Sequence, residues 1–456
     1  MNTLINKNKL IYFFLISLLI GMLSALNWKV AVLIFLVCIF FIVYITLPYK
    51  VHVLGVILLY PYTDFINEKI SIFKIGLSLY IIALLLRGII EKKSKIFFKN
   101  KIVKSYIIFV SVATFSIIFA PDKLGALEEI VRLISIGGMC GIVYCYINCK
   151  KDILKIYKVF LISSIIPIII GFIQSIFNLG MLYGNSKRVI STFGHPSNSG
   201  FYFAFLSINF LVLIISKRYN LLCKNRAYMY VLFLMSIISL YRTSTRSAWI
   251  NFVIGIIIAI LLYYKELIIY CIYIGLPTIL LVYNNIKNRF IGEISSTGAL
   301  VVNIFGISVT GSYASRIYFW IYSIEHMFLE NVLFGAGIGS FFYTYSGIMH
   351  QELIGRAEYV EMHNDMVKIL AETGILGIIV YMIFLLVTLI SMVKVERKII
   401  DKDIKIILRI VIIIFIMSYI LHFTDALFRL LSIEWTLAIL LGIGIKIINL
   451  DKKEVS

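Results

Sequence analysis

Apolar stretches of about 20 residues recur along the chain and alternate with short polar spacers. A helix of that length spans the hydrocarbon core of a bilayer and satisfies its own backbone hydrogen bonds there. The pattern therefore predicts an all-α, polytopic integral membrane protein with about 14 transmembrane helices. The predicted spans lie near residues 9–26, 28–47, 50–62, 74–90, 103–120, 127–147, 153–177, 197–215, 228–241, 246–264, 266–284, 374–393, 404–424 and 429–448.

A long polar segment separates the last three predicted spans from the others. Residues 1–284 hold about eleven predicted spans, and residues 285–373 form a predicted extracytoplasmic loop with amphipathic helices at the membrane interface. Residues 374–456 hold the last spans and a short cytoplasmic tail. The sequence shows no internal repeat and no low-complexity linker. We therefore expect one membrane domain with an embedded external subregion.

The Lys and Arg residues are concentrated in alternate spacers. One side carries basic clusters at residues 7–9, 92–104, 150–151, 217–226, 394–402 and 452–453. The other side carries few basic residues in its short loops, notably Lys69, Lys123, Lys187, Arg188, Arg242 and Arg246. Because basic loops stay on the cytoplasmic side, we predict that both termini are cytoplasmic and that the long segment 285–363 faces outward.

Composition excludes other classes of protein. With 61% hydrophobic residues and a mean hydropathy of +0.99, the chain has more apolar surface than a soluble domain buries. The net charge of +20 arises in the basic spacers, so we expect no nucleic-acid partner. Of the six cysteines, Cys145 and Cys149 lie one helical turn apart without a partnering Cys or His cluster. We therefore predict neither a metal site nor a cofactor.

A polar island lies between Ser315 and Gly377. Its first part, SRIYFWIYSIEHMFLE, predicts a helix that lies in the membrane interface with its apolar side down. The predicted polar stripe holds Arg316, Ser323, His326 and Glu330, and the predicted apolar face holds Ile317, Trp320, Ile324 and Phe328. The stretch GAGIGS that follows lacks the setting of a dinucleotide site, so we interpret it as a tight turn.

His363 and Asn364 precede a short predicted helix that glycines interrupt. Since an imidazole exchanges protons near neutral pH, His363 is a candidate general base toward a sugar hydroxyl. A purely structural role is the alternative. Asn364, Lys368 and Glu372 share one face of the helix. For Glu372 the simpler interpretation is an ion pair with Lys368, four residues earlier.

Three arginines of the outward side, Arg188, Arg246 and Arg316, come from separate loops. A guanidinium is always charged and its planar fork matches phosphate oxygens, so these arginines are candidates for binding a diphosphate. For each of them, anchoring at the membrane interface is the alternative.

Other polar residues have local interpretations. Two pairs four residues apart predict local ion pairs at the ends of spans: Glu128 with Arg132, and Asp425 with Arg429. The alternative for either pair is a position at the border of a polar cavity. His195 precedes a helix start at which Ser197 or Asn198 is the expected cap.

Five motifs follow one another on the predicted outward side. They are STFGHPSNSGFYF at 191–203, RTSTRSAW at 242–249, SRIYFW at 315–320, NVLFGAGIGSFF at 331–342 and MHNDMVKILAETGILG at 362–377. Their order resembles the O-antigen ligase and O-antigen polymerase superfamily of bacterial membrane glycosyltransferases, over roughly residues 185–395. One departure is HPSN at 195–198, where the family more often has Pro followed directly by Asn.

The resemblance implies an enzyme of the bacterial cytoplasmic membrane whose donor is an undecaprenyl-diphosphate-linked oligosaccharide. Its partners would be this donor, an acceptor glycan and membrane lipids, with a chain-length regulator protein as a further candidate. By motif position, Arg246 and Arg316 would hold the donor diphosphate and stabilise it as charge builds on it. His363 would activate the acceptor hydroxyl. The residues implied to bind the diphosphate or to position the site are Arg188, Asn364 and Glu372.

Three functions compete. The first is a polymerase that joins lipid-linked repeat units into O-antigen, capsular or exopolysaccharide. The second is the ligase of the same superfamily, which would transfer the glycan to lipid A-core, and the motifs do not separate the two. The third is a flippase or transporter of lipid-linked oligosaccharide, which would need charged residues along a path through the bilayer. Few charges lie inside the predicted spans, so transport fits the sequence less well.

Overall fold

The computed structural model describes residues 46–69, 73–91, 95–183, 186–222, 225–275, 302–304, 307–309, 312–341 and 362–454, with single residues at 44, 277 and 283. The chain forms two compact units, Met1–Val53 and Leu54–Ser456. In the first unit the described part includes the start of helix α3 (Tyr49–Leu59), where the ring centroids of Tyr44 and His52 are 5.8 Å apart. All that follows concerns the second unit.

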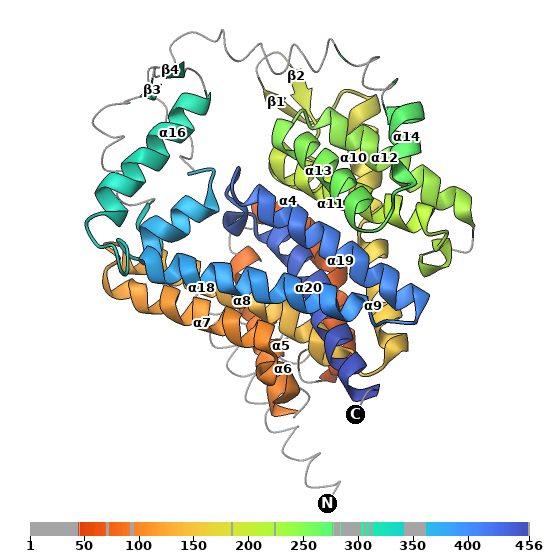
Figure 1. Ribbon diagram of the computed structural model, residues 1–456, viewed down its shortest axis with the longest axis horizontal. Coiled ribbons are helices and arrows are strands. Elements are labelled where there is room, and N and C mark those ends of the chain that lie inside the picture. The colour runs from red at the N-terminus through yellow and green to blue at the C-terminus, as the bar shows by residue number, and fades with distance from the viewer. Residues whose placement is uncertain are drawn as a thin grey trace, which may run out of the picture. The chain divides into compact units, whose positions relative to one another are not determined.

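Helices dominate the second unit (Figure 1). They are α4 (Thr63–Lys69), α5 (Phe73–Ile90), α6 (Lys95–Lys99), α7 (Lys101–Phe115), α8 (Lys123–Tyr146), α9 (Lys150–Ser163), α10 (Ile165–Ile176), α11 (Pro196–Ile215), α12 (Arg226–Arg242), α13 (Arg246–Leu262), α14 (Leu267–Tyr270), α16 (Ser312–Ser323), α18 (Asp365–Glu396), α19 (Lys402–Leu421) and α20 (Leu431–Glu454). Short helical turns are η1 (Tyr60–Tyr62), η2 (Ser116–Ile118), η3 (Tyr219–Leu221), η4 (Cys271–Gly275), η5 (Ile324–Phe328) and η6 (Leu427–Arg429). The described strands form two antiparallel hairpins, β1 (Met181–Tyr183) with β2 (Ser186–Arg188) and β3 (Val302–Ile304) with β4 (Ile307–Val309).

The protein is a multi-pass membrane protein, although the predicted number of spans is not reproduced. Seven helical segments of the described chain are long and apolar enough to cross a membrane: Phe73–Ile90, Lys101–Ile118, Lys150–Ile176, Pro196–Ile215, Asp365–Glu396, Lys402–Leu421 and Leu431–Leu450. The predicted spans 9–26 and 28–47 lie outside the described residues, apart from positions 44, 46 and 47. Of the other predicted spans, α13 is apolar but has only 17 residues. The helix α8 is long enough, but its first turns carry Lys123, Glu129 and Arg132.

Side chains just before several helices determine where those helices start. Asn100 caps α7, Asp122 caps α8, and Asp401 caps α19 by accepting backbone N–H groups of the first turn. Such caps satisfy donors that have no partner within the helix. Because these polar caps precede apolar runs, the helix boundaries agree with the predicted spans to within a few residues.

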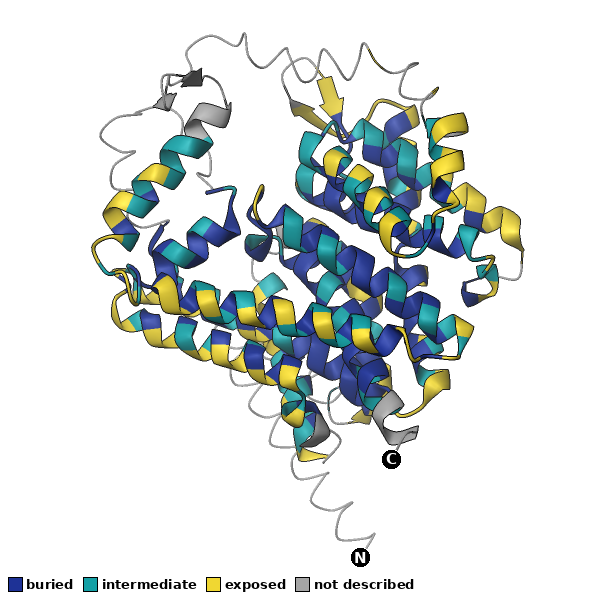
Figure 2. Ribbon diagram, viewed as in Figure 1, coloured by how far each residue is buried: buried dark blue, intermediate teal, exposed yellow. Residues whose placement is uncertain are grey.

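The helices α11 and α20 form the interior of the second unit, since 83% of the residues in the apolar window of each are buried. Only 33% are buried in α7 and α18, which pack against each other and along which buried and exposed residues alternate (Figure 2). Close packing depends on small residues: a Cβ on Gly442 of α20 would lie 2.6 Å from the Cys140 carbonyl oxygen of α8. Buried hydroxyls bond between helices, as Tyr157 does to Asn209 at 2.5 Å.

The predicted polar stripe of the 315–330 helix is only partly correct. Ser323, expected on the polar side, is fully buried and donates to the Phe319 carbonyl at 2.7 Å. Met327 is buried as well, in a small core with Met362. Trp320 donates its indole N–H to the Met362 carbonyl at 2.7 Å. Tertiary contacts with the start of α18 therefore set the buried face of α16 and η5, and this face differs from the one that helical periodicity predicts.

Candidate active site

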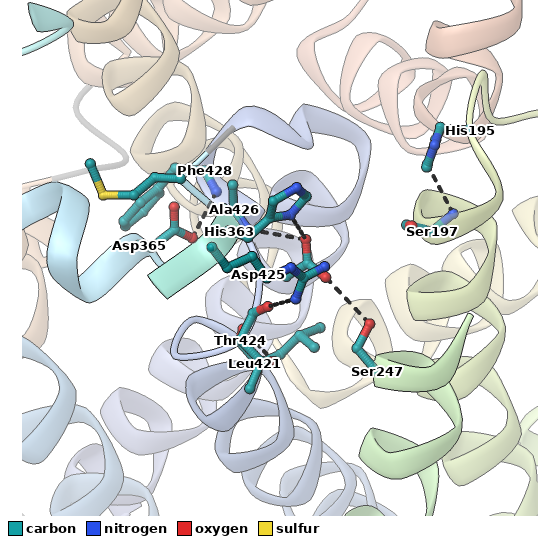
Figure 3. A network of polar contacts seen from close by, with 12 residues as sticks. His195, Ser197, Ser247, His363, Asp365, Leu421, Thr424, Asp425, Ala426 and Phe428 are labelled. Atoms are coloured by element: carbon teal, nitrogen blue, oxygen red, sulfur yellow. Dashed lines mark hydrogen bonds and ion pairs between the residues drawn. The ribbon is translucent and has the colours of Figure 1, made fainter. Parts of the chain in front are cut away.

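A histidine and an aspartate, 62 residues apart in sequence, form the centre of the candidate site. The Nδ1 atom of His363 lies 3.2 Å from Oδ1 of Asp425, and Figure 3 shows the two side chains pointing toward each other. Asp425 is buried, whereas a third of the His363 side chain is exposed. A carboxylate at Nδ1 favours the tautomer whose Nε2 accepts a proton. The pair thus has the geometry of a general base with its orienting acid.

The backbone conformation at His363 and at Asp425 orients the two side chains toward each other. His363 has a positive φ of 49°, which is uncommon for a residue other than glycine. Asn364 then caps α18 by accepting the N–H groups of Met366 and Val367 at 3.0 and 3.1 Å. Asp425 lies in the turn after α19, and Oδ1 also accepts the Ala426 N–H at 3.3 Å. The turn before α18 and the turn after α19 therefore carry the two halves of the pair.

His422 and Asp365 join these two turns. The Asp365 N–H donates to the His422 carbonyl at 2.8 Å, and Nδ1 of His422 lies 2.6 Å from Oδ2 of Asp365. The same carboxylate oxygen accepts the Phe428 N–H at 3.2 Å. On the far side of the ring, Nε2 of His422 is 3.7 Å from Oε1 of Glu434. Since all these groups are buried, the connection is shielded from competing water.

The charge of His422 follows from its two carboxylate neighbours. Burial alone lowers the pKa of His422, but the hydrogen bond to Asp365 and the negative charges of Asp365 and Glu434 outweigh it. The pKa is therefore raised above its ordinary value. His422 lies three residues before Asp425, and its partner Asp365 lies two residues after His363.

Arg316 reaches this pair from α16. Its Nη1 donates to the Thr424 carbonyl at 3.1 Å, one residue before Asp425. The side chain is half-buried, and a guanidinium has five N–H donors, of which this bond uses one. The predicted site residues Arg316 and His363 are thus brought to the same turn.

Arg246 and Ser247 open helix α13 beside the same carboxylate. Ser247 Oγ donates to Oδ2 of Asp425 at 3.3 Å (Figure 3). Arg246 is the residue before it and the first residue of α13, where the positive end of the helix dipole adds to the charge of its guanidinium. The Asp425 carboxylate therefore accepts a hydrogen bond from Ser247 of α13 and faces His363 in the turn before α18.

Arg188 and His195 border the site from the chain between α10 and α11. Strand β2 ends at Arg188, and the next residue, Val189, donates its N–H to the Arg242 carbonyl at 3.2 Å. This bond holds the hairpin against the α12–α13 turn. The pKa of His195 is lowered, mainly because the surrounding protein displaces water; Arg188 and His363 act in the same direction and Asp425 opposes them. Arg188 is buried, and its loop bonds to the α12–α13 turn that precedes Arg246.

His195 and Asn198 have structural partners in addition. The predicted caps of α11 were Ser197 or Asn198, but His195 itself is the cap, and its Nδ1 accepts the Ser197 N–H at 3.2 Å. Asn198 is buried and donates to Asp64 at 3.4 Å. The departure of HPSN from the family pattern therefore falls on residues with clear packing roles.

Glu372 lies away from the His363–Asp425 pair and holds the glycine-rich turn. Its Oε1 accepts the Phe341 N–H at 3.2 Å, and the Glu372 carbonyl accepts the Gly337 N–H at 3.0 Å. Gly335, Gly337 and Gly339 all have positive φ, so the interpretation of GAGIGS as a tight turn is confirmed. Glu372 is thus placed to position this turn on α18.

The predicted local ion pairs are largely replaced by others. Lys368, expected to pair with Glu372, lies 3.4 Å from Glu129 of α8. Arg132 pairs at 2.6 Å with the same Glu129 rather than with Glu128. The predicted partner of Asp425 was Arg429; the structure instead places Asp425 against His363 and Ser247.

Sequence reasoning missed three residues of this site: Asp425, Ser247 and His422. Asp425 was noticed only for its spacing to Arg429, and Ser247 only as part of the RTSTRSAW motif. The available signal was a cluster of titratable residues, HFTDALFR at 422–429, at the end of a candidate span. Among the described residues, no group of three or more His, Cys, Asp or Glu side chains is arranged to hold a metal ion.

The fold and the site define a class: a multi-pass helical membrane protein that gathers arginines and a histidine–aspartate pair where the ends of several helices meet. Within it, residues 231–382 match the protein-family model described as O-antigen ligase. The match covers a third of the chain and agrees with the resemblance that the motifs predict. No protein of curated function matches the chain.

Proposed function

We propose that the protein is a glycosyltransferase that polymerises undecaprenyl-diphosphate-linked repeat units at the outer face of the cytoplasmic membrane. The observation that carries this proposal is the contact between His363 Nδ1 and Asp425 Oδ1 at 3.2 Å, beside Arg316. The superfamily match over residues 231–382, which contain Arg246, Arg316 and His363, supports it.

In the proposed reaction His363 acts as the general base. The acceptor hydroxyl gives its proton to Nε2 of His363, while Asp425 accepts the hydrogen bond from Nδ1–H and stabilises the imidazolium that forms. The acceptor oxygen forms a bond to the anomeric carbon of the donor sugar. The bond from that carbon to the phosphate oxygen breaks, and its electron pair leaves with undecaprenyl diphosphate.

The arginines stabilise the leaving group in this scheme. Negative charge grows on the diphosphate as the bond to the sugar breaks, and fixed positive groups stabilise that charge most at a site with little water. Arg246 and Arg316 flank Asp425 from α13 and α16. Arg188, which is buried at the end of β2, would contact the outer phosphate. Asn364 and Glu372 act indirectly, by capping α18 and by holding the glycine-rich turn.

The ligase reaction is a second candidate. The description of the matching family model, O-antigen ligase, favours it, and the same pair and arginines would perform it with lipid A-core as the acceptor. The two reactions differ in the molecule that carries the acceptor hydroxyl, which is another lipid-linked glycan for the polymerase and lipid A-core for the ligase.

The first test is a gel of the surface glycan of the host after deletion of the gene. Restoration with wild type should return a ladder of glycan lengths, whereas restoration with His363→Ala should leave a single repeat unit. His326→Ala is the matched control, because His326 lies in the same polar segment but packs against Tyr322, with tilted rings whose centroids are 4.5 Å apart. This control should restore the ladder.

Other outcomes of this gel distinguish the alternatives. A ladder that persists on the lipid carrier, with only its attachment to the final acceptor lost, would identify the ligase. Accumulation of lipid-linked repeats on the cytoplasmic leaflet would contradict a transferase and favour transport.

A further inference from the structure

A second histidine is exposed beside the candidate active site. From Arg188 to Ile215, a stretch that the structure describes in full, His195 is the only exposed residue. It lies between β2 and α11, directly before Pro196, the first residue of that helix. The imidazole of His195 can therefore meet a ligand that the buried residues on either side of it cannot reach.

The two nitrogens of this imidazole have different states. Nδ1 of His195 accepts the N–H of Ser197 at 3.2 Å, and a nitrogen that accepts a hydrogen bond carries no proton. The proton of the neutral ring is therefore on Nε2, which has no hydrogen-bond partner within the described residues. The lowered pKa of His195, caused mainly by the protein that displaces water around it, keeps the ring neutral near neutral pH. His195 thus presents a single N–H donor.

The capping of α11 does not by itself require a histidine. The preferred caps are Ser, Thr, Asp and Asn, and Asn residues cap α7, α12 and α18 of this chain. An imidazole differs from these side chains because it has a second nitrogen, on the side of the ring away from the capped N–H. The presence of His at this cap therefore points to a role for Nε2–H in addition to the cap.

The first turns of α11 pack against the first turns of α13, which contact the candidate active site. A Cβ on Gly200, in the second turn of α11, would lie 2.9 Å from the Cβ of Ala248. The residue before Ala248 is Ser247, which donates to Asp425 at 3.3 Å. The charge of Asp425 acts on His195 in turn, and Figure 3 shows both side chains in one close view of the site. The contacts therefore place the start of α11 next to the segments that carry the site.

Positive groups gather at the start of α11. The first residue of α13 is Arg246, and because the starts of α11 and α13 are in contact, the positive ends of two helix dipoles lie side by side. Arg188 is buried at the end of β2, seven residues before His195, and its charge acts on His195. Arg188 and Arg246 are residues that hold the diphosphate in the proposed reaction. An N–H donor among them would meet an oxygen of that diphosphate.

We propose that His195 is a further catalytic residue, whose Nε2–H donates a hydrogen bond to the glycosidic phosphate oxygen of the donor as the sugar leaves. The inference rests on the proposed function, because it assigns His195 a role in that reaction. The bond from the anomeric carbon to this oxygen breaks and its electron pair stays on the oxygen. The acceptor proton goes to His363, while His195 keeps its own proton. A neutral donor suffices, since a hydrogen bond stabilises the growing charge without transfer of a proton.

Two substitutions separate the cap from the donor. His195→Asn keeps an acceptor for the Ser197 N–H, because Asn is a preferred cap, but its short side chain has no donor that reaches the position of Nε2. His195→Gln keeps an amide N–H near that position and loses the favoured cap. Asn225→Ala is the control for loss of a cap alone, since Asn225 caps α12 by accepting the Ala227 N–H at 2.9 Å. Transfer rates and unfolding temperatures are measured with the purified full-length protein and an undecaprenyl-diphosphate-linked glycan.

We expect His195→Asn to lower kcat roughly 100-fold, because the removal of one donor to a developing oxyanion has an effect of this size. The KM and the unfolding temperature should change little, since the glycosidic oxygen gains its charge only as the bond breaks. His195→Gln should recover most of the lost kcat, and Asn225→Ala should lower the unfolding temperature without lowering kcat. A kcat near wild type for His195→Asn, or equal losses of kcat in the Asn and Gln variants, would overturn the inference. Absence of transfer by wild type would instead contradict the proposed function.

Binding of undecaprenyl diphosphate provides a measurement that does not depend on activity. This product carries the charged diphosphate but no sugar, so its affinity reports whether Nε2–H of His195 contacts a phosphate oxygen. We expect His195→Asn to raise the Kd for undecaprenyl diphosphate about tenfold, because a hydrogen bond to a charged group is lost. His195→Gln and Asn225→Ala should stay close to wild type. An unchanged Kd for His195→Asn together with a lowered kcat would assign the contact to the sugar and overturn the proposed contact with the diphosphate.

Discussion

At the scale of single residues, Asp425 determines what His363 can do. Its Oδ1 faces Nδ1 of His363, and its Oδ2 accepts a hydrogen bond from Ser247 at 3.3 Å. A carboxylate held in this way fixes the orientation of the imidazole and stabilises the imidazolium. A third of the His363 side chain is exposed, so packing against the rest of the protein restrains the imidazole only in part. In the proposed role of His363 as a base, its orientation therefore depends on Asp425, which is far from it in the sequence.

We expect Asp425→Asn to lower kcat by roughly two to four orders of magnitude, because the amide cannot stabilise the imidazolium and favours the wrong tautomer. The KM for the donor should change little. Ser247→Ala, which removes one hydrogen bond and keeps the carboxylate, should lower kcat by less than tenfold. Both are measured as initial rates of transfer at saturating donor. A rate near wild type for Asp425→Asn would exclude the role of the pair.

The sequence revealed one half of this pair and not the other. His363 stood out because a titratable side chain beside a polar helix start is rare in an apolar chain. Asp425 has Arg429 four residues away, and a pattern of that kind indicates a local ion pair. Only the packing of the turn before α18 against the turn after α19 shows that Asp425 faces His363. A contact over 62 residues has no periodic signature in a single sequence.

At the scale of elements, the kink of α18 is the feature on which the site depends. Gly374 has φ 67° and ψ −168°, a conformation that is essentially restricted to glycine. A Cβ there would overlap the backbone of Leu333 and Phe334. The kink thus lets the glycine-rich turn approach α18, while the first turns of α18 keep their direction toward His363. The sequence predicted a helix interrupted by glycines here but not the close contact.

We expect Gly374→Ala to destabilise the protein by about 2 kcal/mol or more, through both the forbidden conformation and the overlap. Gly76→Ala on α5 is the control, since its Cβ would meet nothing within 4 Å. That change should be neutral or stabilise the helix by about 0.5–1 kcal/mol. Thermal unfolding in detergent measures both. Equal unfolding temperatures for the two variants would contradict the assigned role of the kink.

The connection through His422 predicts a dependence of stability on pH. A raised pKa in the folded state means that folding is favoured by protonation of His422. This contribution is complete below the ordinary pKa of histidine and is lost as the pH rises through the raised value. His422→Gln removes the side chain that bonds to the buried Asp365 carboxylate and should cost roughly 3–5 kcal/mol near pH 6.

The difference in unfolding temperature between wild type and His422→Gln should therefore shrink as the pH rises. His326→Gln, on the exposed side of η5, is the matched control and should stay close to wild type at every pH. A difference that stays constant or widens with rising pH would show that His422 is neutral in the folded protein.

At the scale of the whole second unit, side-chain bonds connect spacers that the distribution of basic residues assigns to the same side of the membrane. Asp401 pairs with Lys150, Asp403 pairs with Arg218 at 3.2 Å, and Asn100 donates to Asn449 at 3.0 Å. These residues lie in or beside the spacers predicted to be cytoplasmic. The loops predicted to face outward are joined by contacts of their own, which connect the β2 strand, the α12–α13 turn and the turn after α19.

The sequence predicts the sidedness because the distribution of Lys and Arg is a property of many loops together, and the orientation stays a prediction. The number of spans was harder to predict, because apolar composition does not distinguish a long spanning helix from one that is short or has charged first turns, such as α13 or α8. The arrangement of the candidate site was not accessible from the sequence, since the motifs give the order of Arg188, Arg246, Arg316 and His363 but not their distances.

The orientation itself predicts which residues water-soluble reagents can reach. Lys187 on β2 is exposed in the loop group that contains the site, and Cys149 is exposed at the opposite group. If both termini are cytoplasmic, Lys187→Cys should react with a membrane-impermeant maleimide in intact cells, and Cys149 should react only after permeabilisation. The pattern should not depend on activity, so it should be the same in His363→Ala. The reverse pattern would place His363, Asp425 and the arginines on the cytoplasmic face, where a donor that has already crossed the membrane could not reach them.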